Sequence, residues 1–84
     1  MDMGIEQLKL PSYKQLGTYF MFEAFRYEEL SVNAGDTQTA ALLKASANSC
    51  WGRVEVCFDR HFAGETPDHS VIGSSMAELA LRQN

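Results

Sequence analysis

The pattern that most constrains the fold is a series of small and apolar residues that are spaced alternately three and four positions apart. Its members are Ala40, Leu43, Ala47, Cys50, Val54, Cys57 and His61. This spacing is a heptad seam, which puts every member on one side of a long helix and suits an antiparallel packing partner. Trp51, Phe58 and Phe62 widen the apolar stripe. Asp36 before the seam is a good N-cap residue, and Gly64 after it is a good terminator. The sequence therefore predicts a helix over residues 36–63.

A second amphipathic stretch precedes this helix and supplies a partner for it. Ser12 and Gln15 fit a capping box, in which each side chain accepts from a free backbone N–H group of the other residue. At 100° per residue, one face then carries Tyr13, Leu16, Tyr19, Phe20, Ala24, Tyr27 and Leu30. Asn33 and Gly35 are typical of a helix end. We therefore predict a first helix over residues 12–33.

The two ends of the chain have weaker patterns. Residues 1–11 form an arm that is too short to assign to a helix or a strand. Ser75 and Glu78 fit another capping box and favour a short last helix, which could start as early as Thr66 or Asp68. We place this helix over residues 68–83. The expected fold is a single all-α domain over residues 1–84, with an antiparallel helical hairpin and a short C-terminal helix.

Several apolar residues lie away from the face that a hairpin would bury, and they predict a homodimeric four-helix bundle. Small residues on the second helix line a face that another helix can approach closely, and these are Ala41, Ala45, Ser49 and Gly52. Burying one Phe stabilises a protein by about 1.5–3 kcal/mol relative to leaving it in water. A two-fold dimer would achieve this burial. The alternative is that the last helix or residues 1–11 cover the apolar surface.

The first helix also carries a candidate partner-binding surface. Met21, Phe22 and Phe25 project away from its main face, and Glu23 and Arg26 flank them as an expected polar rim. Aromatic and Met side chains are enriched in protein-binding patches. The sequence leaves open whether this surface serves the dimer, a different protein or both.

The sequence offers few residues for catalysis or metal binding. Cys57 and His61 are four positions apart and could share a metal ion with Cys50 and His69, but no C-x-x-C pair accompanies them. The two cysteines are better explained as small buried side chains. Either cysteine could also pair with its symmetry mate across a dimer axis under oxidising conditions. We therefore predict no catalytic residue, no metal and no cofactor.

Charge and composition limit the classes of partner. The 84 residues carry a net charge of −4, and the seven basic residues are scattered. This distribution disfavours nucleic acid and anionic membrane surfaces, which are bound through clustered cations. No apolar run reaches the ~20 residues that span a bilayer, and the N-terminal residues do not have the pattern of a signal peptide. The expected location is therefore the cytoplasm.

Taken together, these features favour a small, acidic, non-enzymatic regulatory protein. It would act as an inhibitor or anti-activator that occludes a larger protein, for example a transcription regulator or a nucleic-acid-binding effector. Two alternatives remain open at this point. One is a sequence-specific DNA-binding regulator, and the other is a carrier of a small apolar ligand held between the helices.

Overall fold

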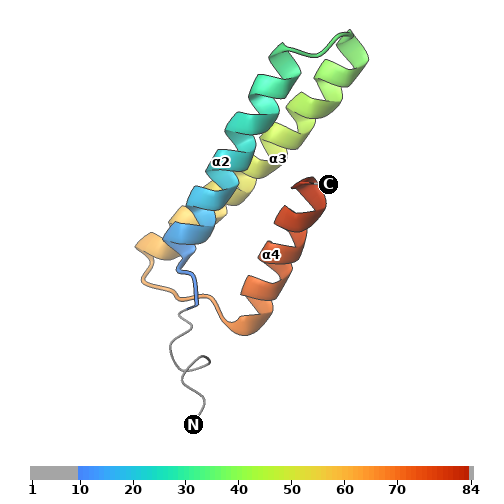
Figure 1. Ribbon diagram of the computed structural model, residues 1–84. Coiled ribbons are helices and arrows are strands. Elements are labelled where there is room, and N and C mark those ends of the chain that lie inside the picture. Colours follow the sequence, from blue (N-terminus) through green and yellow to red (C-terminus); the bar gives the residue numbers. More distant parts are fainter. Residues whose placement is uncertain (1–9, 84) are drawn as a thin grey trace.

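The computed structural model describes residues 10–83, with side chains described as far as Leu79, and this part of the chain has three helices and no strand. Helix α2 spans Tyr13–Val32, α3 spans Thr37–Phe62 and α4 spans His69–Gln83. The two long helices pack against each other as an antiparallel hairpin (Figure 1). This architecture confirms the all-helical prediction of two long helices and a short third. Residues 1–9 of the predicted arm lie outside the described residues.

The helix ends show why these segments are helical where they are. Ser12 Oγ accepts from Gln15 N at 3.1 Å, and Gln15 Oε1 accepts from Ser12 N at 2.9 Å, so the predicted capping box is present. Asp36 caps α3 by accepting a 2.7 Å hydrogen bond from Thr39 N. After α3, Gly64 has a φ of +80°, a conformation that glycine adopts without a steric penalty. Local sequence therefore determines where both long helices begin and where α3 ends.

The start of α4 differs from the capping box that the sequence suggested. Ser75 and Glu78 lie inside the helix, so Ser75 does not open it, and the helix instead starts close to Asp68, one of the earlier starts that the sequence allowed. The helix begins at His69, and Asp68 Oδ1 accepts from Val71 N at 2.9 Å. The physical reason is that Asp68 supplies an N-cap acceptor upstream of Ser75, and Asp is at least as good a cap as Ser.

The core lies between the two long helices and confirms most of the predicted seam. On α3 the buried side chains are Ala47, Cys50, Val54 and Cys57. They face buried side chains of α2 that include Leu16 and Phe20. Tyr19 and Leu30 were expected in this core, but they are 44% and 43% exposed. The neighbouring helices shield only a strip of α2, and these two side chains lie at the edge of that strip.

Helix α4 covers only one half of the hairpin, the half where α2 begins and α3 ends (Figure 1). Leu79 of α4 is buried in the same cluster as Tyr13 and Phe20, and Val71 and Ile72 pack against that cluster. We call residues 13–22 and 51–62 the covered half of the hairpin, and residues 23–32 and 37–50 the free half. This division separates two parts of the molecule that are built differently.

Candidate interaction surface and cavity

An aromatic strip, defined as Phe25, Trp51, Phe58 and Phe62, runs along one side of the hairpin. The rings of Phe25 and Trp51 meet edge to face with centroids 5.1 Å apart, and those of Phe58 and Phe62 are 6.4 Å apart. Phe62 is 80% exposed and Phe25 is 54% exposed, whereas Trp51 and Phe58 are half-buried. Large aromatic rings are therefore presented to solvent on a surface that is partly fixed by packing.

Two features of the sequence position this strip. Trp51, Phe58 and Phe62 follow one another at spacings of seven and four, which puts them on one flank of the α3 seam. Gly17 on α2 leaves room for the Phe58 ring, because a Cβ atom at Gly17 would lie 2.8 Å from that ring. Trp51 is held in turn by a 2.8 Å hydrogen bond from its Nε1 to Glu28 Oε2. The strip is thus anchored by α2 although most of its residues come from α3.

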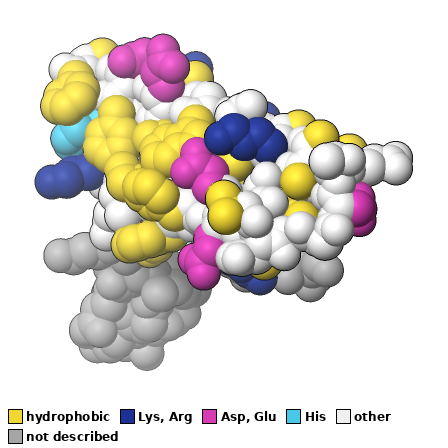
Figure 2. All heavy atoms as spheres, turned by 90° about the horizontal axis from the view of Figure 1, so that it is seen from above, with side chains coloured by type: hydrophobic (Ala, Val, Ile, Leu, Met, Phe, Trp, Pro, Cys, Tyr) yellow, Lys and Arg dark blue, Asp and Glu magenta, His cyan; other side chains and the backbone are white. Residues whose placement is uncertain are grey.

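The strip lies on the side of the hairpin that is turned away from α4. At 100° per residue, Trp51 and Phe58 lie about 60–80° to one side of the α3 seam, and Arg53 lies about 80° to the other. Arg53 is the residue that meets α4, since its Nε is 3.3 Å from Glu78 Oε1. Figure 2 shows hydrophobic side chains gathered toward the end of the hairpin where α2 begins and α3 ends, with charged side chains around them.

The residues predicted to bind a partner are placed in different environments. Phe25 joins the aromatic strip, and Phe22 is 65% exposed about one sixth of a turn away on α2. Met21 is partly buried and packs against the core. Arg26 is exposed, with its Nη1 3.7 Å from Glu23 Oε1. Glu23 itself is 7% exposed, so the expectation that it forms a polar rim is wrong, because its position on α2 shares the core face.

The residues predicted for the dimer interface share the outer face of α3. Ala41, Ala45, Ser49 and Gly52 are all exposed, and this face points away from α2. A Cβ atom built at Gly52 would have nothing within 4 Å, so no element of the described chain packs closely there. The structure therefore separates this small-residue face from the aromatic strip, and each surface can be tested independently.

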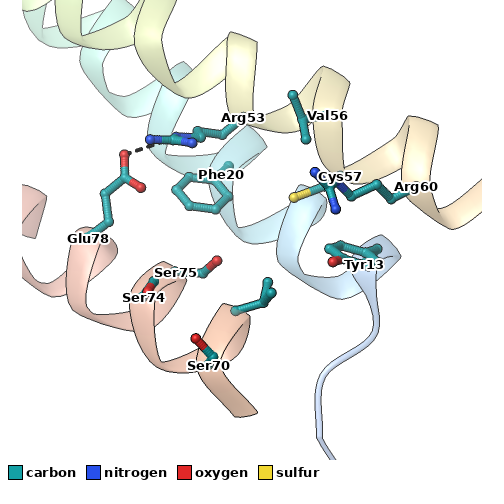
Figure 3. Close-up of a pocket in the computed structure, with 11 residues that line it drawn as sticks. Tyr13, Phe20, Arg53, Val56, Cys57, Arg60, Ser70, Ser74, Ser75 and Glu78 are labelled. Carbon is teal, nitrogen blue, oxygen red and sulfur yellow. Dashed lines mark hydrogen bonds and ion pairs between the residues drawn. The ribbon is translucent and has the colours of Figure 1, made fainter. Parts of the chain in front are cut away.

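A cavity of about 310 Å³ lies between the hairpin and α4 (Figure 3). The Cα atoms of α4 come within 8 Å of those in α2 but of none in α3, within the described residues. Long side chains bridge the resulting gap, as in the ion pair between Arg53 and Glu78. The cavity is lined by Tyr13, Phe20, Arg53, Val56, Cys57, Arg60, Ser70, Val71, Ser74, Ser75 and Glu78.

The cysteines are free thiols and both are buried. Burial raises the pKa of the Cys57 thiol, while nearby Arg53 and Arg60 oppose that rise. No group of three or more His, Cys, Asp or Glu side chains is arranged to hold a metal ion among the described residues. His61 contacts the Phe62 ring, with centroids 5.4 Å apart.

Comparisons with known proteins identify no relative of this chain. No family model matches the chain, and no curated protein or solved structure is significantly similar to it. None of the described helices is long and apolar enough to cross a membrane.

Sequence reasoning missed two sets of residues that the structure brings together. Trp51, Phe58 and Phe62 belong to the wide apolar stripe of α3, and only their offset from the heptad seam signals that they flank it. The residues of the cavity carry no such signal. Arg60 and Ser74 are far apart in the chain, and they line one cavity only because α4 folds back along the hairpin.

Proposed function

We propose that this chain is a small non-enzymatic regulatory protein that binds and occludes a larger protein through the aromatic strip. The exposure of Phe25 and Phe62 on a side that α4 leaves uncovered is the observation that carries this proposal. Exposed aromatic clusters of this kind are typical of the centre of protein interfaces. Phe22 and Arg26 are exposed on α2 within one turn of Phe25 and would contact the edge of the partner.

The way the strip is held supports a binding role. Trp51 is fixed by its hydrogen bond to Glu28 and by the Phe25 ring, so it loses little rotational freedom when a partner binds. A surface that is ordered before binding loses less entropy on association. The acidic chain, with its net charge of −4, would favour a partner whose contact surface is basic.

We further propose that the chain forms a homodimer through the small-residue face of α3. Ala41, Ala45 and Gly52 would let a second α3 approach closely, as helices with small side chains do in helix pairs. Because this face and the aromatic strip are on different sides of α3, a dimer would leave both strips free. Each protomer would then bind one partner molecule.

Photo-crosslinking in the cells that make the protein tests the partner-binding proposal. A photoreactive amino acid replaces Phe25, Phe62 or, as a control, Leu42. Leu42 is 65% exposed but lies outside the strip. We expect the photoreactive group at position 25 or 62 to capture one discrete protein, and the group at position 42 not to capture it. This capture should be lost when the chain with the group at position 25 also carries Phe62→Ser. Equal capture from Leu42 would show that the strip is not the binding surface.

Sedimentation equilibrium tests the dimer. We expect Ala45→Arg to dissociate it, because a buried unpaired charge is costly at a helix interface. Phe25→Ser should leave the dimer intact. A wild-type chain that remains monomeric at the highest concentration would contradict the dimer, and dissociation by Phe25→Ser alone would move the interface to the strip.

A further inference from the structure

The cavity beneath α4 has the size of a small-ligand site. Ligand pockets in proteins span about 300–1,000 Å³, and the volume here is about 310 Å³. It suits a molecule of modest size, such as a short-chain acid or a single substituted ring.

One part of the cavity lining is apolar. Tyr13 and Phe20 of α2 are buried side chains of this lining, and Val56 of α3 and Val71 of α4 also belong to it. Figure 3 shows the Phe20 ring and the Tyr13 ring on the same side of the space, facing α4. These side chains would hold an apolar body of a ligand.

The α3 part of the lining is cationic. Arg53 and Arg60 are seven positions apart, which puts them on the same face of α3 two turns from each other. Arg60 lies over the Tyr13 ring, with its Cζ 5.8 Å from the ring centroid. Its ion pair with Glu65 is 3.7 Å long and half-exposed, and pairs of this kind contribute little. Arg60 can therefore exchange Glu65 for another anion at little cost in free energy.

The α4 part of the lining supplies hydrogen-bonding groups. Ser70, Ser74 and Ser75 place hydroxyl groups along the cavity, opposite the arginines (Figure 3). Hydroxyl groups donate to carboxylate or phosphate oxygens, and guanidinium groups bind the same oxygens through charge-assisted hydrogen bonds. Glu78 is paired with Arg53 at the far end, so the cationic end of the cavity is at Arg60.

From this arrangement we propose that the cavity between α4 and the hairpin binds a small organic anion, with its charged end at Arg60 and the α4 serines and its short apolar tail against Tyr13 and Phe20. This proposal is independent of the aromatic strip, which lies on the other side of α3. A ligand in this position would link α4 to the hairpin by contacting both.

A titration followed by amide NMR spectra of the full-length protein tests the site. The probes are sodium hexanoate, hexyl phosphate and the neutral isostere 1-hexanol. We expect saturable shifts confined to residues lining the cavity for the two anions, with binding of 1-hexanol at least about tenfold weaker. The stronger of the two anionic probes then identifies the carboxylate or the phosphate ester as the preferred head group.

Two matched variants locate the charged end of the ligand. Arg60→Gln should weaken binding of the better anion by about tenfold and leave binding of 1-hexanol unchanged. Lys44→Gln removes the same charge from an exposed position on the free half, and it should bind the anion as the wild type does. A third variant, Ser74→Leu, fills the cavity and should abolish binding of all three probes.

Four results would overturn the proposal. The first is an absence of saturable shifts up to ~10 mM probe, a concentration that would largely saturate a site with a dissociation constant of about 1 mM. The second is equal binding of 1-hexanol and the anions. The third is an equal loss of affinity in Lys44→Gln and Arg60→Gln, and the fourth is a set of shifts that map to the aromatic strip. None of these readouts depends on whether the strip binds another protein.

Discussion

The two helices of the hairpin pack through different kinds of side chain in its two halves. In the covered half, large side chains such as Leu16 and Phe20 are buried between three helices, with Leu79 of α4 closing the cluster. In the free half, the helices meet through small residues, and Ala24 and Ala47 are both fully buried. A hydrogen bond from the Ser31 side chain to the Ala40 carbonyl, 2.8 Å long, also joins the two helices there.

This difference explains where the chain can bind other molecules. Small residues bring the helices of the free half close together, but they bury little apolar area, and larger side chains are displaced to its sides. Phe25 and Leu42 are examples, at 54% and 65% exposed. The covered half has a well-filled core on one side and a cavity where α4 does not reach α3. The aromatic strip therefore runs along the uncovered side of both halves, whereas the cavity belongs to the covered half alone.

The largest expected effect comes from comparing one phenylalanine in each half. Phe20→Ala removes a ring that is 1% exposed and should destabilise the protein by about 3–5 kcal/mol. This is a large share of the roughly 4–13 kcal/mol expected for a chain of this length. Phe25→Ala removes a half-exposed ring and should cost about 1 kcal/mol or less, mainly its contact with Trp51. Urea denaturation followed by circular dichroism measures both.

Equal losses from the two substitutions would contradict the division of the hairpin. A large loss from Phe25→Ala that depends on protein concentration would have a different meaning, because it would show that the ring is buried against a second copy.

Two helical glycines should respond in opposite directions to the same substitution. A Cβ atom at Gly17 would lie 2.8 Å from the Phe58 ring and 3.2 Å from Cys57 Cβ, so Gly17→Ala overpacks the covered half. We expect a net loss of about 1–2 kcal/mol, since overpacking outweighs the gain in helix propensity. Gly52→Ala meets open space in the isolated protomer and should gain about 0.5–1 kcal/mol there, so both glycine variants are compared in the monomeric Ala45→Arg chain. Thermal unfolding of the two variants checks the signs.

The glycine pair also tests how the strip is built. If Gly17→Ala proved as stabilising as Gly52→Ala, the Phe58 ring would have moved aside at no cost, and the close packing that anchors the strip to α2 would be absent. Fluorescence of Trp51 should change little in either variant.

Two adjacent glutamates in the free half should show a smaller change in stability, and one of them serves as a matched control for the other. Glu28→Ala removes the acceptor of the Trp51 Nε1 hydrogen bond, and we expect a loss of about 1 kcal/mol. Glu29→Ala removes the same charge from the next, exposed position and should change stability by no more than about 0.5 kcal/mol. The Trp51 emission spectrum should shift in Glu28→Ala only. An unchanged spectrum would show that the hydrogen bond does not persist in solution.

The sequence predicts the hairpin well because its information is local. The heptad seam from Ala40 to His61 and the caps at Ser12 and Asp36 depend on residues within a few turns of each other. The position of α4 is different. Its own sequence gives an amphipathic helix but not the side of the hairpin on which it packs, and that choice depends on long-range contacts such as Leu79 with the core.

The same distinction applies to the candidate sites. Phe22 and Phe25 could be recognised as exposed because the periodicity of α2 alone places them away from its core face. Glu23 could not be recognised as buried, since a carboxylate is seldom expected to be buried. The cavity could not be predicted at all, because Arg60 and Ser74 become neighbours only through the turn between α3 and α4.

The smallest expected effect concerns the tip of the free half, where Asp36 caps α3. Hydrogen bonds from Thr39 to its carboxylate lower the pKa of Asp36 below its ordinary value of 3.8. A carboxyl group whose pKa is lower in the folded state stabilises the fold above the ordinary value, and that stabilisation is lost as the pH falls through the lowered pKa. Asp36→Asn keeps an N-cap acceptor but removes the titration. We therefore expect the wild type to have a slightly higher Tm than Asp36→Asn at pH 7, and the difference to vanish below the lowered pKa. A difference that persisted in strong acid would arise from geometry and not from charge, and the cap of the free half would then act as the uncharged Ser12 cap of the covered half does.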